Sequence, residues 1–105
     1  MSGLLYHLVA ATDWPDGTDD YSPASLNTEG FIHLSNASQA PDTSLRYYAD
    51  VADLMIVTID PTRLTAAVEW EDLVGHGAFP HLYGSLNRDA IESIDPYVAG
   101  TPIVE

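Results

Sequence analysis

The stretch EGFIHLS, residues 29–35, places a histidine in the middle of an apolar run that is otherwise typical of a core strand. The run FPHLYGS, residues 79–85, repeats this arrangement, and so does LLYHLVA, residues 4–10. Glycine, proline and serine flank these short runs, which favours strands over helices. The sequence therefore predicts three strands that each carry one imidazole, and these imidazoles are the main indication of function.

Apolar patterning and turn residues place the remaining elements. The continuous run LMIVTI, residues 54–59, predicts a central strand that is buried on both faces. The segment that follows Pro41 predicts the one clear helix, with Leu45 and Tyr48 facing inward. We expect strands at residues 4–11, 31–34, 54–59, 67–71, 81–83 and 91–98, a helix at 42–50, irregular structure at 21–26, and a loose tail from residue 99.

The length of the chain, 105 residues, predicts a single domain that spans residues 1–105. Strands outnumber helices and are separated mostly by loops. We therefore expect an α+β fold, in which a small, split or curled, mainly antiparallel β-sheet packs with one main helix. No apolar run approaches the roughly 20 residues that span a bilayer, and no signal peptide is visible, so a cytoplasmic location is the expected one.

Net charge narrows the range of partners. The chain has 16 Asp and Glu residues against three arginines and no lysine, which gives a formal net charge of −13. A protein that binds nucleic acid needs several cations to displace the counterions of the phosphate backbone. We therefore expect neither nucleic acid nor a membrane as a partner. The acidity favours solubility, and the alternative is an acidic surface that docks a basic protein.

Strand alternation sorts the candidate side chains by face. Successive residues of a strand point to opposite sides, so His33 shares a face with Phe31 and Ser35. By the same rule, His81 shares a face with Tyr83. If the sheet brings the three strands together, the imidazoles can line one pocket with Ser35 and Tyr83. The alternative for each histidine is a place in the core, where hydrogen bonds alone satisfy it.

Histidine spacing bears on metal binding. His7 shares a face with Leu5 and Val9 on the first strand, whereas Tyr6 points to the other face. His76 lies between two glycines in a polar loop and is predicted at the surface. Three histidines could hold zinc with an open position, but no H-x-H or H-x-x-x-H spacing is present and the chain has no cysteine. We therefore expect no metal site.

Carboxylates and aromatic side chains extend the set of candidates. Glu71 follows Trp70, and an indole beside the carboxyl group would desolvate it and raise its pKa into a range useful for acid–base catalysis. The alternative is a solvated glutamate on a strand face, and Glu29 is a second carboxylate candidate. Tyr6 and Tyr83 could stack on a planar ring such as a nucleobase or nicotinamide. The sequence contains no GxGxxG, GxSxG, P-loop or HExxH motif, which argues against classical dinucleotide folds and common hydrolases.

Five segments combine these features in order: YHLVAATDW at 6–14, EGFIHLS at 29–35, LMIVTIDPTRL at 54–64, VEWED at 68–72 and FPHLYGSL at 79–86. In their order and spacing they resemble the small bacterial proteins of the family called domain of unknown function 952, or DUF952. The resemblance extends over residues 4 to about 97, and EGFIHLS and FPHLYG are its most specific parts.

The resemblance implies a fold and an activity. The DUF952 family is similar in fold to the ADP-ribosyltransferase superfamily, particularly its compact RNA 2′-phosphotransferase branch. This implies a split β-sheet with a cleft for NAD as cofactor, and transfer of ADP-ribose to a small molecule or a protein. The chain departs from that branch because it lacks the arginines that hold an RNA phosphate, so RNA is not the expected substrate.

The resemblance also implies roles for single residues. His7 takes the place of a first-strand histidine that contacts the ribose on the nicotinamide side, and His33 and Ser35 match the second motif. Tyr83 with His81, or else Glu71, fills the third position. The predicted catalytic residues are thus His7, His33 and Glu71, and the predicted cofactor-binding residues are Tyr6, Ser35, His81 and Tyr83.

Two alternatives to an NAD-using enzyme stay open. The first is a non-catalytic domain that binds a nucleotide-like or other small ligand in the same pocket. The second is a protein-interaction module that uses its acidic face, whose binding would weaken in high salt.

Overall fold

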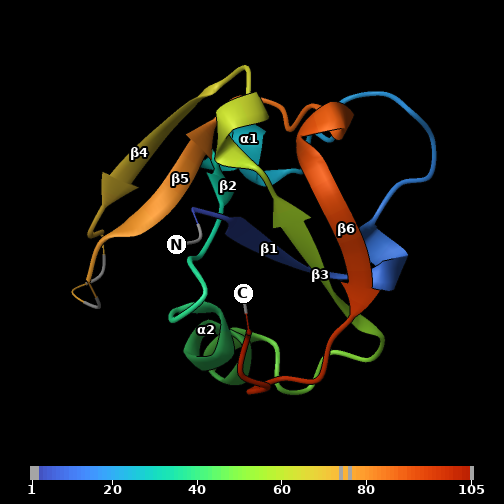
Figure 1. Ribbon diagram of the computed structural model, residues 1–105, viewed down its shortest axis with the longest axis vertical. Helices are drawn as coiled ribbons and strands as arrows, with labels where there is room; N and C mark the ends of the chain where they lie inside the picture. The colour runs from blue at the N-terminus through green and yellow to red at the C-terminus, as the bar shows by residue number, and fades with distance from the viewer. Residues whose placement is uncertain (1–2, 74, 76, 105) are drawn as a thin grey trace.

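Two three-stranded antiparallel sheets and one main helix form the molecule (Figure 1). The computed structural model describes residues 3–73, 75 and 77–104. The strands are β1 Leu5–Ala10, β2 Ile32–His33, β3 Leu54–Ile59, β4 Ala67–Glu71, β5 Phe79–Tyr83 and β6 Ile91–Pro96, and the helices are α1 Ser25–Thr28 and α2 Ala40–Tyr47. The first sheet has the order β1-β3-β6 and the second has the order β2-β5-β4. The expected α+β class with a split antiparallel sheet is confirmed.

Strand β3 is the centre of the first sheet and is covered on both faces, as its continuous apolar sequence predicts. Leu54 and Ile56 point into one hydrophobic cluster, while Val57 and Ile59 point into another. The larger cluster fills the space between the two sheets and contains Leu5, Val9, Tyr21, Ile32, Leu34, Val57, Ile59, Leu82, Leu86 and Ala90. The smaller cluster lies between the first sheet and α2 and contains Tyr6, Leu8, Ala40, Leu54 and Ile56.

The segment around β2 joins the two sheets. Ile32 and His33 pair with Leu82 and His81 of β5, which places them in the second sheet. Two residues further on, the backbone N–H of Ser35 donates to the carbonyl of Tyr6, and the N–H of Tyr6 donates to the carbonyl of Ser35, both at 2.8 Å. This short segment therefore pairs with β5 at its start and with β1 at its end.

Helix α2 differs from its sequence prediction in extent and in its buried face. It begins at Ala40, two residues before the expected start, and ends at Tyr47. Its buried residues are Ala40 and Ser44, four residues apart, whereas Leu45 is 54% exposed. The expectation that Leu45 faces inward is wrong, because two small side chains form the inner stripe and let the helix approach the sheet. No helix in the part of the chain that the structure describes has the length and apolarity of a membrane span.

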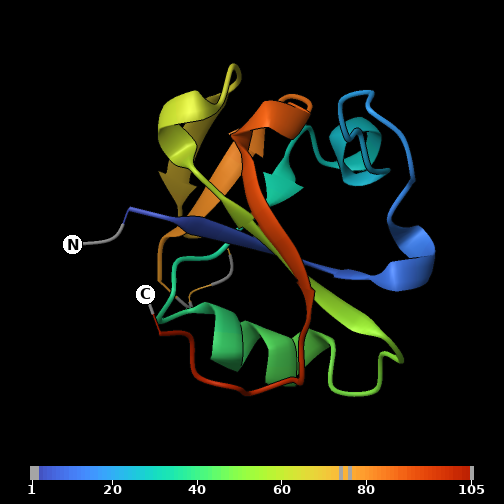
Figure 2. The ribbon, with the colours of Figure 1, turned by 45° about the vertical axis from the view of Figure 1, so that its right-hand side comes forward.

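Two segments expected to be irregular or loose are ordered. Helix α1 forms where irregular structure was expected, because Pro23 precedes the helical turn and its carbonyl accepts from Leu26 N–H at 3.1 Å. The C-terminal segment runs alongside α2 (Figure 2). Its Gly100 N–H donates to Ser44 Oγ at 2.8 Å, and Ile103 packs against the smaller cluster. The expected loose tail is therefore wrong, since backbone and apolar contacts hold the segment in place.

The position of Ser44 yields a test of this anchoring. Its Oγ donates to the Pro41 carbonyl at 2.7 Å and accepts from Gly100, and the side chain is fully buried. Ser44→Ala leaves both backbone groups without that partner, so we expect the free energy of unfolding to fall by about 1–3 kcal/mol. Urea denaturation measures it. Ser93→Ala, at an exposed site of β6, serves as the control and should change stability by less than about 0.5 kcal/mol. Equal effects of the two substitutions would contradict the anchoring.

Candidate functional site

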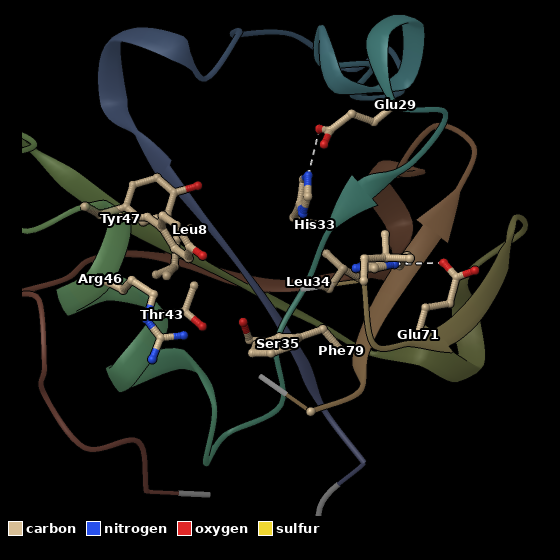
Figure 3. Close-up of a pocket in the computed structure, with 14 residues that line it drawn as sticks. Leu8, Glu29, His33, Leu34, Ser35, Thr43, Arg46, Tyr47, Glu71 and Phe79 are labelled. Carbon is tan, nitrogen blue, oxygen red and sulfur yellow. Dashed lines mark hydrogen bonds and ion pairs between the residues drawn. The ribbon is translucent and has the colours of Figure 1, made fainter. Parts of the chain in front are cut away.

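A cleft of about 510 Å³ opens between the second sheet and helix α2 (Figure 3). This volume lies within the range of small-molecule sites, about 300–1,000 Å³. The second sheet contributes the titratable side chains His33, Glu71 and His81, and Glu29 extends from the end of α1. Helix α2 contributes Thr43, Arg46 and Tyr47 on the facing side. Leu8, Leu34, Tyr48 and Phe79 add apolar surface to the lining. The cleft therefore combines a polar sheet face with apolar and aromatic surroundings.

The inner pair of the cleft consists of His81 on β5 and Glu71 on β4. The Nδ1 atom of His81 lies 2.8 Å from Oε1 of Glu71, and the hydroxyl of Tyr83 donates to the same oxygen at 2.6 Å. Alternation on β5 puts His81 and Tyr83 on one face, and pairing of β4 with β5 brings Glu71 opposite Phe79. The side chain of His81 is 6% exposed and that of Glu71 is 32% exposed.

The hydrogen bonds of the inner pair keep Glu71 ionised. The bonds donated by Tyr83 and then by His81 hold the pKa of the Glu71 carboxyl below its ordinary value. The hydrogen bond between Tyr83 and Glu71 also raises the pKa of the Tyr83 hydroxyl. The expectation that an indole raises the pKa of Glu71 is wrong, because the neighbouring Trp70 is 51% exposed and its strand position directs it to the opposite face. An ionised Glu71 only accepts hydrogen bonds, so Nδ1 of His81 carries the proton, and in a neutral imidazole Nε2 is then an acceptor.

The outer pair consists of His33 and Glu29 at the more exposed part of the cleft. Nε2 of His33 lies 2.8 Å from Oε2 of Glu29, and the two side chains are 54% and 49% exposed. The ring centroids of His33 and His81 are 5.6 Å apart. The structure thus brings two of the three strand histidines to one cleft, as strand alternation predicts.

The ring of Phe31 packs against the histidines of both pairs. Its ring stacks on His81 with centroids 4.1 Å apart, meets His33 edge-on at 4.9 Å and lies 5.3 Å from Tyr83. The residue is 5% exposed, so the contacts are protected from water. Sequence reasoning placed Phe31 on the same face as His33 but did not treat it as a site residue. The sequence signal for its role is its place two residues before His33, on the same strand face.

His7 does not line the cleft. The Nδ1 atom of His7 donates to the carbonyl of His33 at 2.8 Å, and the hydroxyl of Tyr21 donates to Nε2 at 3.0 Å. Burial lowers the pKa of His7 to about 4, so the ring is neutral near pH 7. The expectation that His7 shares a pocket with the other imidazoles is therefore wrong. Its face of β1 turns toward the larger cluster, and there it supports the backbone of β2.

The remaining predicted residues divide between cleft and core. Ser35 lines the cleft, and Tyr83 reaches it through its bond to Glu71. Tyr6 is 4% exposed and packs in the smaller cluster instead. His76 lies outside the described residues. Among the residues described, no group of three or more His, Asp or Glu side chains could hold a metal ion.

Comparison with known proteins places the chain in a family. The family described as "Protein of unknown function (DUF952)" matches residues 8–94. The chain belongs to this family. No curated protein matches it.

Two solved structures of another protein resemble this DUF952 chain. The X-ray crystal structure of protein CC0527 from Caulobacter crescentus is 27% identical, with a TM-score of 0.74, over 95% of this chain and 93% of that one. The solution NMR structure of CC0527 is 26% identical, also with a TM-score of 0.74, over 89% of this chain and 83% of that one. The likeness therefore extends over nearly the whole fold.

Sequence reasoning missed the helix side of the cleft. Thr43, Arg46 and Tyr47 line it from α2, yet none of them stands in a recognisable motif. Their spacing shows only that they occupy one side of a helix. The packing of α2 on β1 of the first sheet places them across the cleft from His33 and Glu71.

The buried, neutral state of His7 predicts a pH dependence of stability. Its pKa is about 4 in the folded chain, whereas the ordinary value of 6.5 applies to the unfolded chain. Between these values the unfolded chain binds a proton that the folded chain does not, so the free energy of unfolding falls as the pH decreases. We expect a loss of about 3 kcal/mol from this group between pH 6.5 and pH 4.

Urea denaturation across this pH range measures the loss. His7→Gln removes the titrating group, and its curve should be flatter than that of the wild type. His33→Gln is the matched control at an exposed imidazole and should retain the decline. Parallel curves for the wild type and His7→Gln would contradict the assignment.

The bond from Tyr83 to Glu71 predicts a shift in the pKa of the carboxylate. Tyr83→Phe removes the largest cause of the lowered value, so the pKa of Glu71 should rise toward its ordinary range. Carboxyl-carbon NMR titration measures this shift. Tyr97→Phe is the control, because the Tyr97 hydroxyl donates to the Thr101 carbonyl away from the cleft. An unchanged pKa of Glu71 in Tyr83→Phe would show that the bond does not act on the carboxylate.

Proposed function

We propose that this DUF952 protein binds NAD in the cleft and transfers the ADP-ribose group to a small molecule or a protein. The observation that carries the proposal is the ionised Glu71, held by Tyr83 and His81 at the side of a cleft of small-molecule size. Breaking the bond between ribose and nicotinamide develops positive charge on the ribose, and a fixed carboxylate nearby stabilises that charge. The resemblance of the family to the ADP-ribosyltransferase superfamily supports the same reaction.

The lining offers groups for each part of NAD. Phe79 and Tyr48 provide apolar surface for the nicotinamide ring. Ser35 and Thr43 carry hydroxyls suited to the ribose, and Arg46 is a cation suited to the diphosphate.

The proposed reaction balances without a further reactant. The glycosidic C–N bond breaks, and its electron pair leaves with nicotinamide. A lone pair of the acceptor forms the new bond to C1′ of the ribose. The acceptor proton passes to an imidazole nitrogen of the cleft. His33 is better placed than His81 to receive it from an entering acceptor, because His33 is the more exposed of these two histidines.

Isothermal titration with NAD, ADP-ribose and nicotinamide tests binding, and chromatographic assay of released nicotinamide tests turnover. We expect saturable binding of NAD that His33→Ala abolishes. Glu71→Gln should retain NAD binding but lower the rate of release by about 10²–10³, because it removes one transition-state interaction.

The control for the charge change is Glu92→Gln. This exposed residue lies on β6 of the first sheet and does not line the cleft, so the rate should stay unchanged. Absence of heat with all three ligands would refute the proposal.

One observation favours a second candidate, a non-catalytic domain that binds a small nucleotide-like ligand. His7, which the superfamily resemblance places at the ribose, is buried behind β2 instead. Binding of NAD or ADP-ribose with no nicotinamide released over hours would establish this candidate in place of the enzyme.

A further inference from the structure

We infer that the cleft selects an organic cation, a planar ring with a positive charge and an adjacent N–H donor, over neutral and anionic rings of the same shape. The inference rests on the proposed function in that it concerns the same cleft, and it names the charge class of the group bound there. Three independent features of the lining carry it.

The first feature is the balance of charge. Two carboxylates, Glu29 and Glu71, line the cleft, and Arg46 is the one basic side chain among the described lining residues. With the histidines counted as neutral, the lining has a formal charge of −1. The chain as a whole has a net charge of −13, so the surrounding field has the same sign. The charge of the lining and the field of the whole chain both attract a cation and repel an anion.

The second feature is the aromatic surface beside the fixed carboxylate. Phe79 and Glu71 are direct cross-strand partners on β5 and β4, and both line the cleft. Tyr47, which is 61% exposed, and Tyr48 line it from the helix side. A cation over an aromatic face gains about 0.5–2 kcal/mol, more when it is shielded from water. A flat cation can therefore contact a ring and a carboxylate at once.

The third feature is an unpaired nitrogen in the inner pair. Nδ1 of His81 is bound to Glu71, and no described residue bonds to its Nε2. The side chain of His81 is 6% exposed, yet within the described part of the chain no fully buried side-chain nitrogen or oxygen lacks a partner. Nε2 therefore retains access to the cleft that His81 lines. In the neutral imidazole with its proton on Nδ1, this nitrogen accepts a hydrogen bond from a ligand, such as one from a carboxamide N–H.

Three ligands that share the same pyridine ring but differ in charge test the inference. They are 1-methylnicotinamide, which is a cation because its ring nitrogen is methylated, nicotinamide, which is neutral, and nicotinate, which is an anion near neutral pH. We expect 1-methylnicotinamide to bind at least about tenfold tighter than nicotinamide, and nicotinate to bind weakest. NMR titration gives the dissociation constants and shows whether the imidazole resonances of His33 and His81 shift.

Three variants assign the preference to the cleft. Glu71→Gln should bring the affinity for the cation down to that for nicotinamide. Glu92→Gln, which removes the same charge from an exposed position of β6 outside the lining, should leave the preference intact. Arg46→Gln should tighten cation binding, since it removes the opposing charge from an exposed helix position. Thermal unfolding of each variant checks that it is folded. The tighter cation binding expected for Arg46→Gln is a gain, so it tests the inference even if Glu71→Gln is unstable.

The results separate this inference from the proposed function. Cation preference without NAD binding would support the inference and refute NAD use. NAD binding with equal affinity for the cation and nicotinamide would support NAD use and overturn the inference. The inference is also overturned if none of the three rings binds, or if the cation preference survives in Glu71→Gln.

Discussion

The alternation of residues 31–35 between two environments is the constraint on which the site depends. Ile32 and Leu34 pack in the cluster between the sheets, so the opposite face of the same segment carries His33 toward the cleft, with the ring of Phe31 packed beside it. The backbone pairs with β5 at its start and with β1 at Ser35. A shift of one residue in this register would exchange the buried and the cleft-facing side chains. Burial of apolar side chains between the sheets thus also holds the imidazole in place.

The second sheet positions the titratable side chains of the inner pair. Neighbouring strands set His81 beside Glu71, and the hydroxyl of Tyr83 adds a second donor to the same carboxylate oxygen. Two donors favour the ionised carboxylate, which in turn fixes the tautomer of the imidazole. Phe31 lies against both histidines, so their rings are packed as well as hydrogen-bonded. The site is therefore ordered by contacts within the protein itself.

His7 shows how a polar side chain in a core run can serve the site indirectly. The chain uses its two ring nitrogens for the His33 carbonyl and the Tyr21 hydroxyl, so no buried polar group of the ring is left without a partner. The bond to the carbonyl fixes the strand that carries His33. In this chain His33 and His81 line the cleft and His7 supports the strand of His33, yet all three lie in the same kind of apolar run.

The sequence by itself determined the strands, the single main helix, the α+β class and the face on which His33, Ser35, His81 and Tyr83 lie, because strand periodicity is local. It did not determine that His7 lies behind β2, that Ser44 and not Leu45 faces inward on α2, or that the C-terminal segment is anchored. Those features depend on which elements pack together, and so does the meeting of Glu71 with His81 and of Arg46 with the cleft. Only the tertiary structure decided them, since a side chain's charge state and partners follow from neighbours that are distant along the chain.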